Sequence, residues 1–263
     1  MLIEHTLFGT VDKVADAVKL LRNNEPPEGY YVCFSGGKDS VVALDLVKRA
    51  GVKFDAHHNV TTVEPPQLMK FIRDNYPDVI KESPRYTMAQ LIVKHKMPPM
   101  RKYRYCCQEL KERGGKGRVK VTGIRAEESP RRAKRQQIES DKKDGTFVHV
   151  IKNWTTDEIW QYIRENNLPY CSLYDEGFHR IGCVLCPFEN YAQALADIER
   201  FPAIVDYYRR AFCKIFESFD RKPRTWKSGD DMFDWWIKER RGFHIAEDCN
   251  SIPLFSEDDG SIL

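Results

Sequence analysis

Residues 35–40, SGGKDS, have the composition of an anion-binding turn. They follow an aromatic, β-prone run and precede a helical pattern, so backbone N–H groups at the helix start would point toward a ligand. The glycines let a phosphate approach the backbone closely. The hydroxyls can donate hydrogen bonds, the lysine adds positive charge, and the aspartate can hold Mg²⁺ or cap the helix. The predicted anion residues are Ser35, Gly36, Gly37, Lys38, Asp39 and Ser40.

This turn differs from two well-known nucleotide loops. The Walker loop has four residues between its first glycine and Gly-Lys, and the dinucleotide turn reads GxGxxG. The alternative to an anion site is a tight strand-to-helix turn that binds nothing.

Four cysteines form a second group of residues that could take part in chemistry. Cys106 and Cys107 are adjacent, and Cys183 and Cys186 form a C-x-x-C turn 76 residues further on. A C-x-x-C turn lets two thiolates bind one metal centre. The side chains of adjacent cysteines tend to point in different directions. This suits an iron–sulfur cubane, in which each thiolate can reach a different iron. A zinc site, a redox dithiol at 183 and 186, and four unrelated cysteines are the alternatives.

An α/β fold is expected to position these residues. Strands alternate with helices, which predicts a doubly wound, mostly parallel sheet. A nucleotide and cluster domain is expected over residues 1–190, and a helical C-terminal extension over 191–263. Strands are predicted at 29–36, 52–60, 118–125 and 147–154, and helices at 11–21, 38–51, 64–77, 87–96, 155–169, 189–200, 203–219 and 230–241.

Composition indicates a soluble, cytoplasmic protein. The 263 residues are 41% hydrophobic, and no apolar run approaches the roughly 20 residues of a membrane span. The N-terminus lacks the pattern of a signal peptide, so the eight cysteines are expected to stay reduced. The net charge is +3, but residues 94–135 hold 15 Lys or Arg against 4 Asp or Glu. This segment suits phosphate, sulfate or nucleic acid, or is a solvated face.

Several segments together resemble one known family. SGGKDS resembles the PP-loop of ATP pyrophosphatases, and the spacing of the cysteine pairs resembles the 4Fe–4S adenylyl-sulfate reductases. VTGIRAEESPRRAKR resembles a nucleotide-facing segment of the phosphoadenosine phosphosulfate (PAPS) reductase family, and residues 153–188 resemble the stretch leading to its second cysteine pair. The similarity covers about residues 28–190.

The resemblance implies roles for individual residues. The six anion residues would cradle an adenine nucleotide, with Lys38, Asp39 and Arg125 as catalytic residues and Mg²⁺ oriented by Asp39. Cys106, Cys107, Cys183 and Cys186 would ligate a 4Fe–4S cluster. Arg131 and Arg132 are candidate anion contacts, and His179 and Arg180 are candidate neighbours of the cluster ligands.

Two departures from the family bear on function. The reductases have a degraded PP-loop, whereas this one is intact. They also end in Glu-Cys-Gly-x-His, whereas the nearest match here is AEDCNS, with Cys249 as a nucleophile or an ordinary cysteine. The leading hypothesis is therefore ATP-dependent adenylation with sulfur transfer. A PAPS or adenylyl-sulfate reductase that produces sulfite, and a non-catalytic nucleic-acid-binding subunit, are the alternatives.

The expected ligands and partners follow from these hypotheses. They are ATP or an adenylyl sulfonucleotide, Mg²⁺, a sulfur donor or thiol reductant protein, nucleic acid through residues 94–135, and a second copy of the chain. Residues 59–64 follow the second strand, where an adenosine would be read. His57 and His58 are expected to be surface or hydrogen-bonded histidines. Trp235 and Trp236 are expected in the core, and Cys33, Cys171 and Cys213 are expected to be structural.

Overall fold

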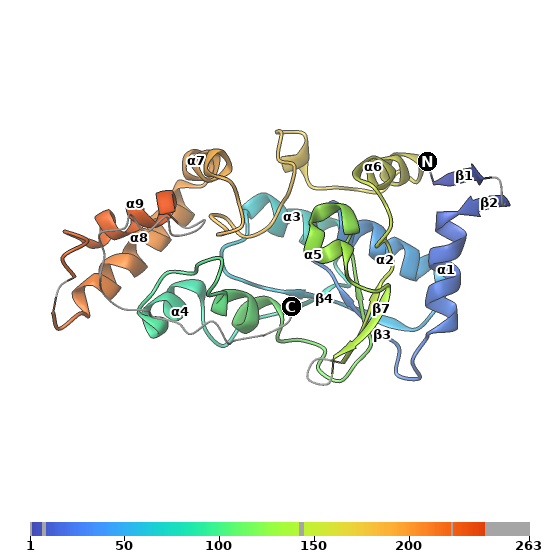
Figure 1. Cartoon of the computed structure of the whole chain (residues 1–263), viewed down its shortest axis with the longest axis horizontal. Coiled ribbons are helices and arrows are strands. Elements are labelled where there is room, and N and C mark those ends of the chain that lie inside the picture. Colours follow the sequence, from blue (N-terminus) through green and yellow to red (C-terminus); the bar gives the residue numbers. More distant parts are fainter. Residues whose placement is uncertain (1, 7–8, 142–144, 222, 240–263) are drawn as a thin grey trace.

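The computed structural model describes residues 2–6, 9–141, 145–221 and 223–239. Its centre is a six-stranded sheet in which five strands are parallel and the edge strand β7 is antiparallel to β8 (Figure 1). This confirms the predicted α/β fold class. In spatial order the strands are β5 (Ile80–Glu82), β4 (Phe54–Asn59), β3 (Tyr30–Cys33), β6 (Lys120–Thr122), β8 (Gly145–His149) and β7 (Ile138–Asp141).

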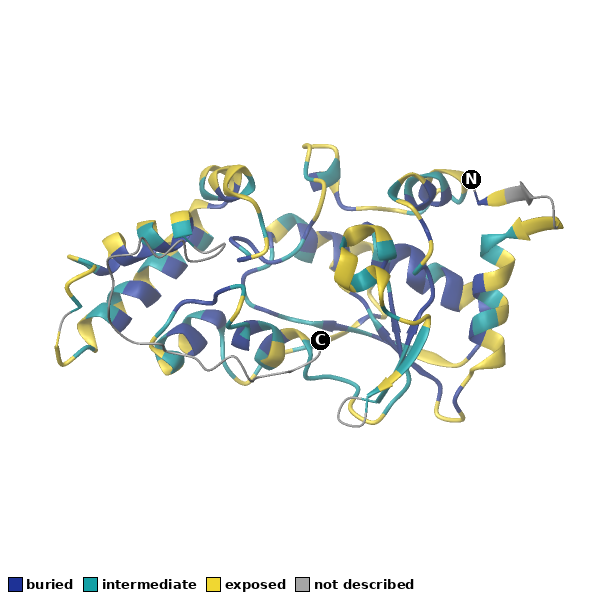
Figure 2. Ribbon diagram, viewed as in Figure 1, coloured by how far each residue is buried: buried dark blue, intermediate teal, exposed yellow. Residues whose placement is uncertain are grey.

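Helices cover this sheet because their apolar faces are buried against it (Figure 2). α2 (Lys38–Ala50) packs against α1 (Lys13–Asn23) and α6 (Thr156–Glu165). A capping box formed by Thr155 and Glu158 begins α6. The other helices of this part are α3 (Pro66–Asn75), α4 (Met88–His95) and the short α5 (Pro130–Ala133).

The chain begins with a two-stranded antiparallel hairpin, β1 (Ile3–Thr6) and β2 (Gly9–Asp12). The expected start of the first helix at Val11 is therefore wrong, because Val11 and Asp12 pair within the hairpin. The helix begins at Lys13, where the Asp12 carboxylate accepts the N–H groups of Val14 and Ala15.

The C-terminal extension contains α7 (Tyr191–Arg200), α8 (Pro202–Glu217) and α9 (Gly229–Glu239). α8 (orange in Figure 1) packs on α9 (red) and on α4 (blue-green). Trp236 is fully buried and its indole N–H donates to the Pro99 carbonyl at 2.8 Å, so its predicted core role is confirmed. No helix in the described residues is both long and apolar enough to cross a membrane.

Candidate active site

The anion loop, residues 35–40, joins the carboxyl end of β3 to the first turn of α2. Gly36 adopts φ +77°, a left-handed conformation that favours glycine. A Cβ atom there would lie 2.7 Å from a methyl carbon of Leu68 and 2.8 Å from one of Ile72. The tight turn is therefore possible because the sequence provides no side chain at this position.

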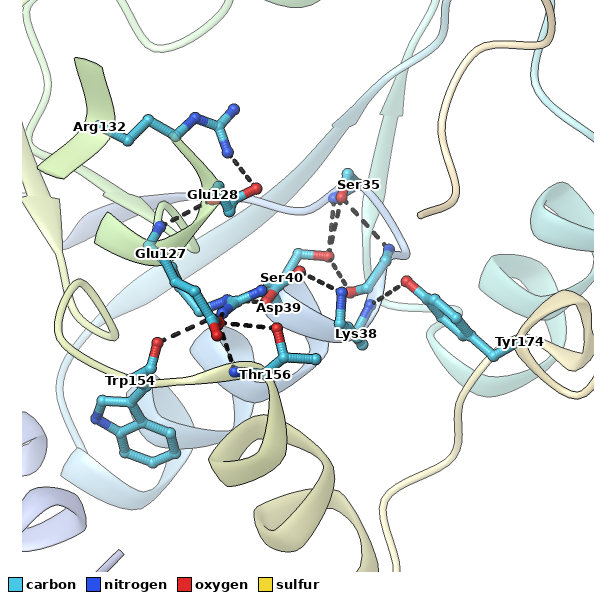
Figure 3. A network of polar contacts seen from close by, with 12 residues as sticks. Ser35, Lys38, Asp39, Ser40, Glu127, Glu128, Arg132, Trp154, Thr156 and Tyr174 are labelled. Carbon is cyan, nitrogen blue, oxygen red and sulfur yellow. Dashed lines mark hydrogen bonds and ion pairs between the residues drawn. The ribbon is translucent and has the colours of Figure 1, made fainter. Parts of the chain in front are cut away.

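Three backbone N–H groups of the anion loop donate to hydroxyl oxygens (Figure 3). Ser35 N donates to Ser40 Oγ at 3.2 Å, and Gly37 N donates to Ser35 Oγ at 3.3 Å. Lys38 N, at the start of α2, donates to the Tyr174 hydroxyl at 2.9 Å. These N–H groups are the kind that bind phosphate oxygens at a helix start. Tyr174 is the one partner among these three bonds that comes from outside the loop.

Charged side chains converge beside the loop. Arg125 is 3% exposed, and its Nε donates to Asp39 Oδ1 at 2.5 Å. Lys38 Nζ lies 3.2 Å from the other Asp39 oxygen. A second Arg125 nitrogen donates to Glu127 at 2.6 Å and to the Trp154 carbonyl at 3.4 Å. Burial opposes the charge of Arg125, but Asp39 and Glu127 outweigh it and raise its pKa.

These contacts bear on the predicted role of Asp39. Both of its carboxylate oxygens already face a cation, Lys38 or Arg125. A magnesium ion would have to compete with both, so this geometry fits Asp39 as the residue that orients the two cations better than as a Mg²⁺ ligand. Lys38, Asp39 and Arg125, the predicted catalytic residues, lie in contact with one another, and their catalytic role stays a prediction.

A cavity opens beside the anion loop at the ends of β3 and β4. This loop cavity is open to solvent and has a volume of about 130 Å³. Its lining includes three residues of the segment expected to read adenosine. The lining residues are Cys33, Phe34, Ser35, His57, His58, Asn59, Thr61, Glu64, Leu68, Lys111, Gly182 and Cys183.

Two histidines in this lining were expected to be ordinary surface or hydrogen-bonded residues. His58 is 4% exposed, and its Nδ1 lies 3.1 Å from the Phe34 carbonyl. That carbonyl can only accept, so Nδ1 carries a proton. Nε2 has no hydrogen-bond partner among the described residues and lies 3.7 Å from Glu64. His57 is held between Asp55 and Glu82.

The two cysteine pairs line a second, shared cavity. Cys106 and Cys107 come from the segment after α4, and Cys183 and Cys186 from the segment before α7. Thr61, Lys111 and Cys183 line both this cysteine cavity and the loop cavity. The anion loop and the cysteines therefore face neighbouring spaces.

Local backbone geometry presents the first cysteine pair. Residues Cys107–Lys111 form a π-helical turn, η1. Such turns are uncommon and occur frequently at functional sites. The wider turn places Cys107 and Lys111 on the cavity wall together.

The C-x-x-C turn is held by contacts from three directions. Leu185 has φ +58°, which is unfavourable for a residue with a branched side chain. Its N–H donates to the buried Asp197 carboxylate of α7 at 2.7 Å. Val184 N donates to the Val63 carbonyl at 2.9 Å, and the Tyr208 hydroxyl of α8 donates to the Val184 carbonyl at 3.2 Å. The helical extension therefore fixes the second cysteine pair.

The thiols strongly influence one another. A hydrogen bond from Cys106, with Lys111 and Arg104 nearby, lowers the pKa of the Cys107 thiol. Burial and the neighbouring Cys183 raise the pKa of Cys186 to about 11. Cys183 in turn raises the pKa of Lys111. Two basic side chains, Lys111 and Arg104, thus lie beside the group of thiols, which suits a centre that carries negative charge.

The thiol arrangement can be compared with candidate metal centres. Among the residues that the structure describes, no three His, Cys, Asp or Glu side chains are grouped so as to hold a single metal ion. All four cysteines line one cavity, and four thiolates are the donor set that a 4Fe–4S cluster uses, one for each iron.

Other predicted residues lie outside these cavities. Arg131 is exposed, and Arg132 pairs with Glu128. His179 and Arg180 are exposed and line neither cavity, so a direct role beside the cysteines is not supported. Cys249 lies outside the described residues.

The basic segment 94–135 does not present all of its cations to solvent. Five of them pair with carboxylates, and Arg125 and Lys120 are buried. The ion pairs are Lys94–Glu109, Arg118–Asp55, Arg125–Asp39, Arg132–Glu128 and Arg135–Glu139. Part of the local charge is therefore paired within the fold, and nucleic-acid binding stays a prediction.

Sequence comparison identifies the family. Residues 29–189 match the phosphoadenosine phosphosulfate reductase domain, and the chain belongs to this family. The adenosine 5′-phosphosulfate reductase of Staphylococcus haemolyticus is 30% identical over 232 residues, covering 82% of this chain and 81% of that protein. An uncharacterized protein of Methanocaldococcus jannaschii is 28% identical over 236 residues, covering 79% of this chain. The chain spans only 44% of that second protein.

A solved structure also resembles the chain. The phosphoadenylyl-sulfate reductase of Candida auris, in its phosphate complex, is 21% identical and aligns with a TM-score of 0.47. The alignment covers 64% of this chain and 87% of that one.

Proposed function

We propose that the chain is an adenylyl-sulfonucleotide reductase that releases sulfite and AMP. The observation that carries this proposal is the common wall of the two cavities: the loop cavity runs from Ser35 of the anion loop to Cys183, which also lines the cysteine cavity. A nucleotide whose phosphate lies at the loop would direct its sulfonate toward the thiols. Family membership and the Staphylococcus relative support the same reaction.

In this proposal the anion loop binds and orients the substrate. Loop N–H groups and Lys38 hold the phosphate oxygens, while Arg125, fixed by Asp39 and Glu127, adds positive charge beside them. The negative charge that grows on the departing AMP is stabilised by the same groups. Lys111, which faces both cavities, offsets the charge of the sulfonate.

The reaction consumes two thiols. A thiolate, from Cys249 or from the reductant protein, attacks sulfur; an S–S bond forms, the S–O bond to phosphate breaks, and AMP departs. A second thiol then attacks the sulfur atom that came from the first thiol. A disulfide forms, the S–S bond to the sulfonate breaks, and sulfite is released. A 4Fe–4S cluster held by Cys106, Cys107, Cys183 and Cys186 would supply a charged, redox-active centre next to the sulfonate.

A second candidate is ATP-dependent activation with sulfur transfer. The intact SGGKDS loop favours it, since ATP needs phosphate contacts beyond those of a sulfonucleotide. An acceptor oxygen would attack the α-phosphorus and release pyrophosphate, and a sulfur donor would then displace AMP from the activated acceptor.

One set of anaerobic assays separates these candidates. The purified protein is incubated with a dithiol reductant and adenylyl sulfate, PAPS or ATP, and sulfite, pyrophosphate and the nucleotide product are measured. Sulfite with an equal amount of AMP from adenylyl sulfate, or of adenosine 3′,5′-bisphosphate from PAPS, supports the reductase, whereas pyrophosphate from ATP supports the second candidate. Cys249→Ser, with Cys213→Ser as its control, tests which thiol attacks. Nucleic-acid binding without turnover of any nucleotide would favour a non-catalytic subunit and contradict both.

A further inference from the structure

The Tyr174 side chain contacts the anion loop at the first turn of α2. Its hydroxyl accepts the N–H of Lys38 at 2.9 Å, and its ring lies 5.6 Å from the Lys38 ammonium (Figure 3). A Cβ atom added at Gly37 would lie 3.4 Å from this hydroxyl. Tyr174 therefore covers the loop at the first N–H of α2.

The tyrosine belongs to a segment that leads to the second cysteine pair. It ends the short turn η3 (Ser172–Tyr174). At the other end of the segment, Ile181 directly precedes Gly182 and Cys183, and its carbonyl oxygen lies 3.9 Å from the position that a Cβ atom at Gly37 would take. Both ends of the segment from Tyr174 to Ile181 thus approach the anion loop. This short segment connects Tyr174 to Cys183 along the chain.

The phenol remains neutral in this position. Burial raises the pKa of Tyr174, and the carboxylate of Asp39 acts in the same direction. A neutral hydroxyl is a weaker acceptor for an N–H at a helix start than a phosphate or sulfate oxygen, because the latter carries charge. An oxyanion is therefore expected to accept a stronger hydrogen bond from the Lys38 N–H than the Tyr174 hydroxyl does.

We propose that the Tyr174 hydroxyl is a displaceable stand-in for a phosphate oxygen, and that its displacement by a nucleotide couples the anion loop to the segment preceding Cys183. The ligand class is an oxyanion: the phosphate of a nucleotide or inorganic pyrophosphate. The inference rests on the proposed nucleotide-binding role of the loop, and it adds a positioning residue that the sequence did not indicate.

The direct test is the affinity of Tyr174→Phe for AMP and for pyrophosphate, measured by calorimetry at constant ionic strength. Because the bound anion no longer displaces a hydroxyl, affinity is expected to rise roughly two- to ten-fold, the equivalent of one net hydrogen bond. Tyr170→Phe is the matched control. Tyr170 packs in the same aromatic group, but its hydroxyl donates to Asp175 rather than accepting from the loop, so affinity stays unchanged.

Hydrogen exchange provides a second readout that does not depend on a variant. Pyrophosphate is expected to increase exchange in residues 172–182 of the wild-type protein, and Tyr174→Phe should show the increase before any ligand is added. Unchanged or weaker binding by Tyr174→Phe, or wild-type exchange that falls on binding, overturns the inference while leaving the proposed function intact. A wild-type protein that binds neither AMP nor pyrophosphate overturns both.

Discussion

The position of Arg125 beside the anion loop requires an arginine. Its guanidinium is buried and donates to Asp39, Glu127 and the Trp154 carbonyl from a rigid, planar fork. A lysine carries the same charge at one point and cannot reproduce three directions. These contacts orient the guanidinium, and its positive charge offsets the negative charges of Asp39 and Glu127.

Arg125→Lys is therefore expected to be costly despite conserving charge. Unfolding free energy should fall by about 1–3 kcal/mol, because buried hydrogen-bonded charges lose partners. Nucleotide affinity should fall about ten-fold or more. Denaturant unfolding and calorimetry measure the two effects. Arg131→Lys, at an exposed site, should change neither; equal effects for both variants would contradict a special role for Arg125.

The thiols allow a second prediction at the residue scale. Anaerobically purified protein should hold about four irons and four sulfides per chain. Cys106→Ser and Cys183→Ser, one from each pair, should each lose most of this iron, because both pairs line one cavity. Cys213→Ser, in α8, should keep it. One zinc per chain, or iron unaffected by either substitution, would be inconsistent with the cluster assignment.

Some site residues were predictable and others were not. The two cysteine pairs were predicted to meet because their spacing is specific. Tyr174 and His58 carry no such signal: their positions depend on how the segment after α6 folds over α2, and on how β4 lies beside β3. Lys111, four residues after Cys107, was predictable in principle from helical spacing.

At the scale of elements, one buried histidine joins three strands. His149 of β8 is fully buried; its Nδ1 lies 2.6 Å from the Thr122 hydroxyl of β6, and its Nε2 lies 3.1 Å from Glu139 of β7. Burial lowers the pKa of His149, and Arg135 and Lys152 add to this, while Glu139 acts in the opposite direction. The ring is therefore neutral, accepting from Thr122 and donating to Glu139.

This arrangement predicts a pH-dependent stability of the sheet. The unfolded chain takes up a proton at His149 near its ordinary pKa of about 6.5, but the folded chain resists it, so stability falls as pH drops below that value. The contribution cannot exceed about 1.4 kcal/mol per pH unit. Urea unfolding from pH 7.5 to 5 measures it. His149→Gln should show a shallower dependence; an identical slope would refute the assignment.

The elements missed from the sequence share a physical reason. β5 has three residues and no buried member, and β7 has polar residues and lies at the sheet edge, so neither shows an apolar pattern. The hairpin β1–β2 precedes a strong helix signal that hides it. Long helices such as α2 and α6 were predictable because caps and apolar spacing agree with the buried faces.

At the scale of the whole molecule, the helical extension forms part of the site. Tyr208 of α8 lines the cysteine cavity and bonds to the Val184 carbonyl, and Asp197 of α7 accepts the Leu185 N–H. The predicted division at residue 190 therefore separates segments that contact each other at the cysteine cavity. The sheet positions the anion loop, and the extension secures the turn that carries Cys183 and Cys186.

This cooperation predicts that a substitution in α7 will weaken metal binding at a distance. Asp197→Ala removes the buried acceptor that holds Leu185 in its left-handed conformation, which should reduce the free energy of unfolding by about 1–3 kcal/mol. Iron should also be released faster to a chelator, since the second cysteine pair loses its support. Glu199→Ala, exposed on the same helix, should retain wild-type stability and iron. If Asp197→Ala lowers stability yet releases iron at the wild-type rate, the extension stabilises the fold without holding the thiols in place.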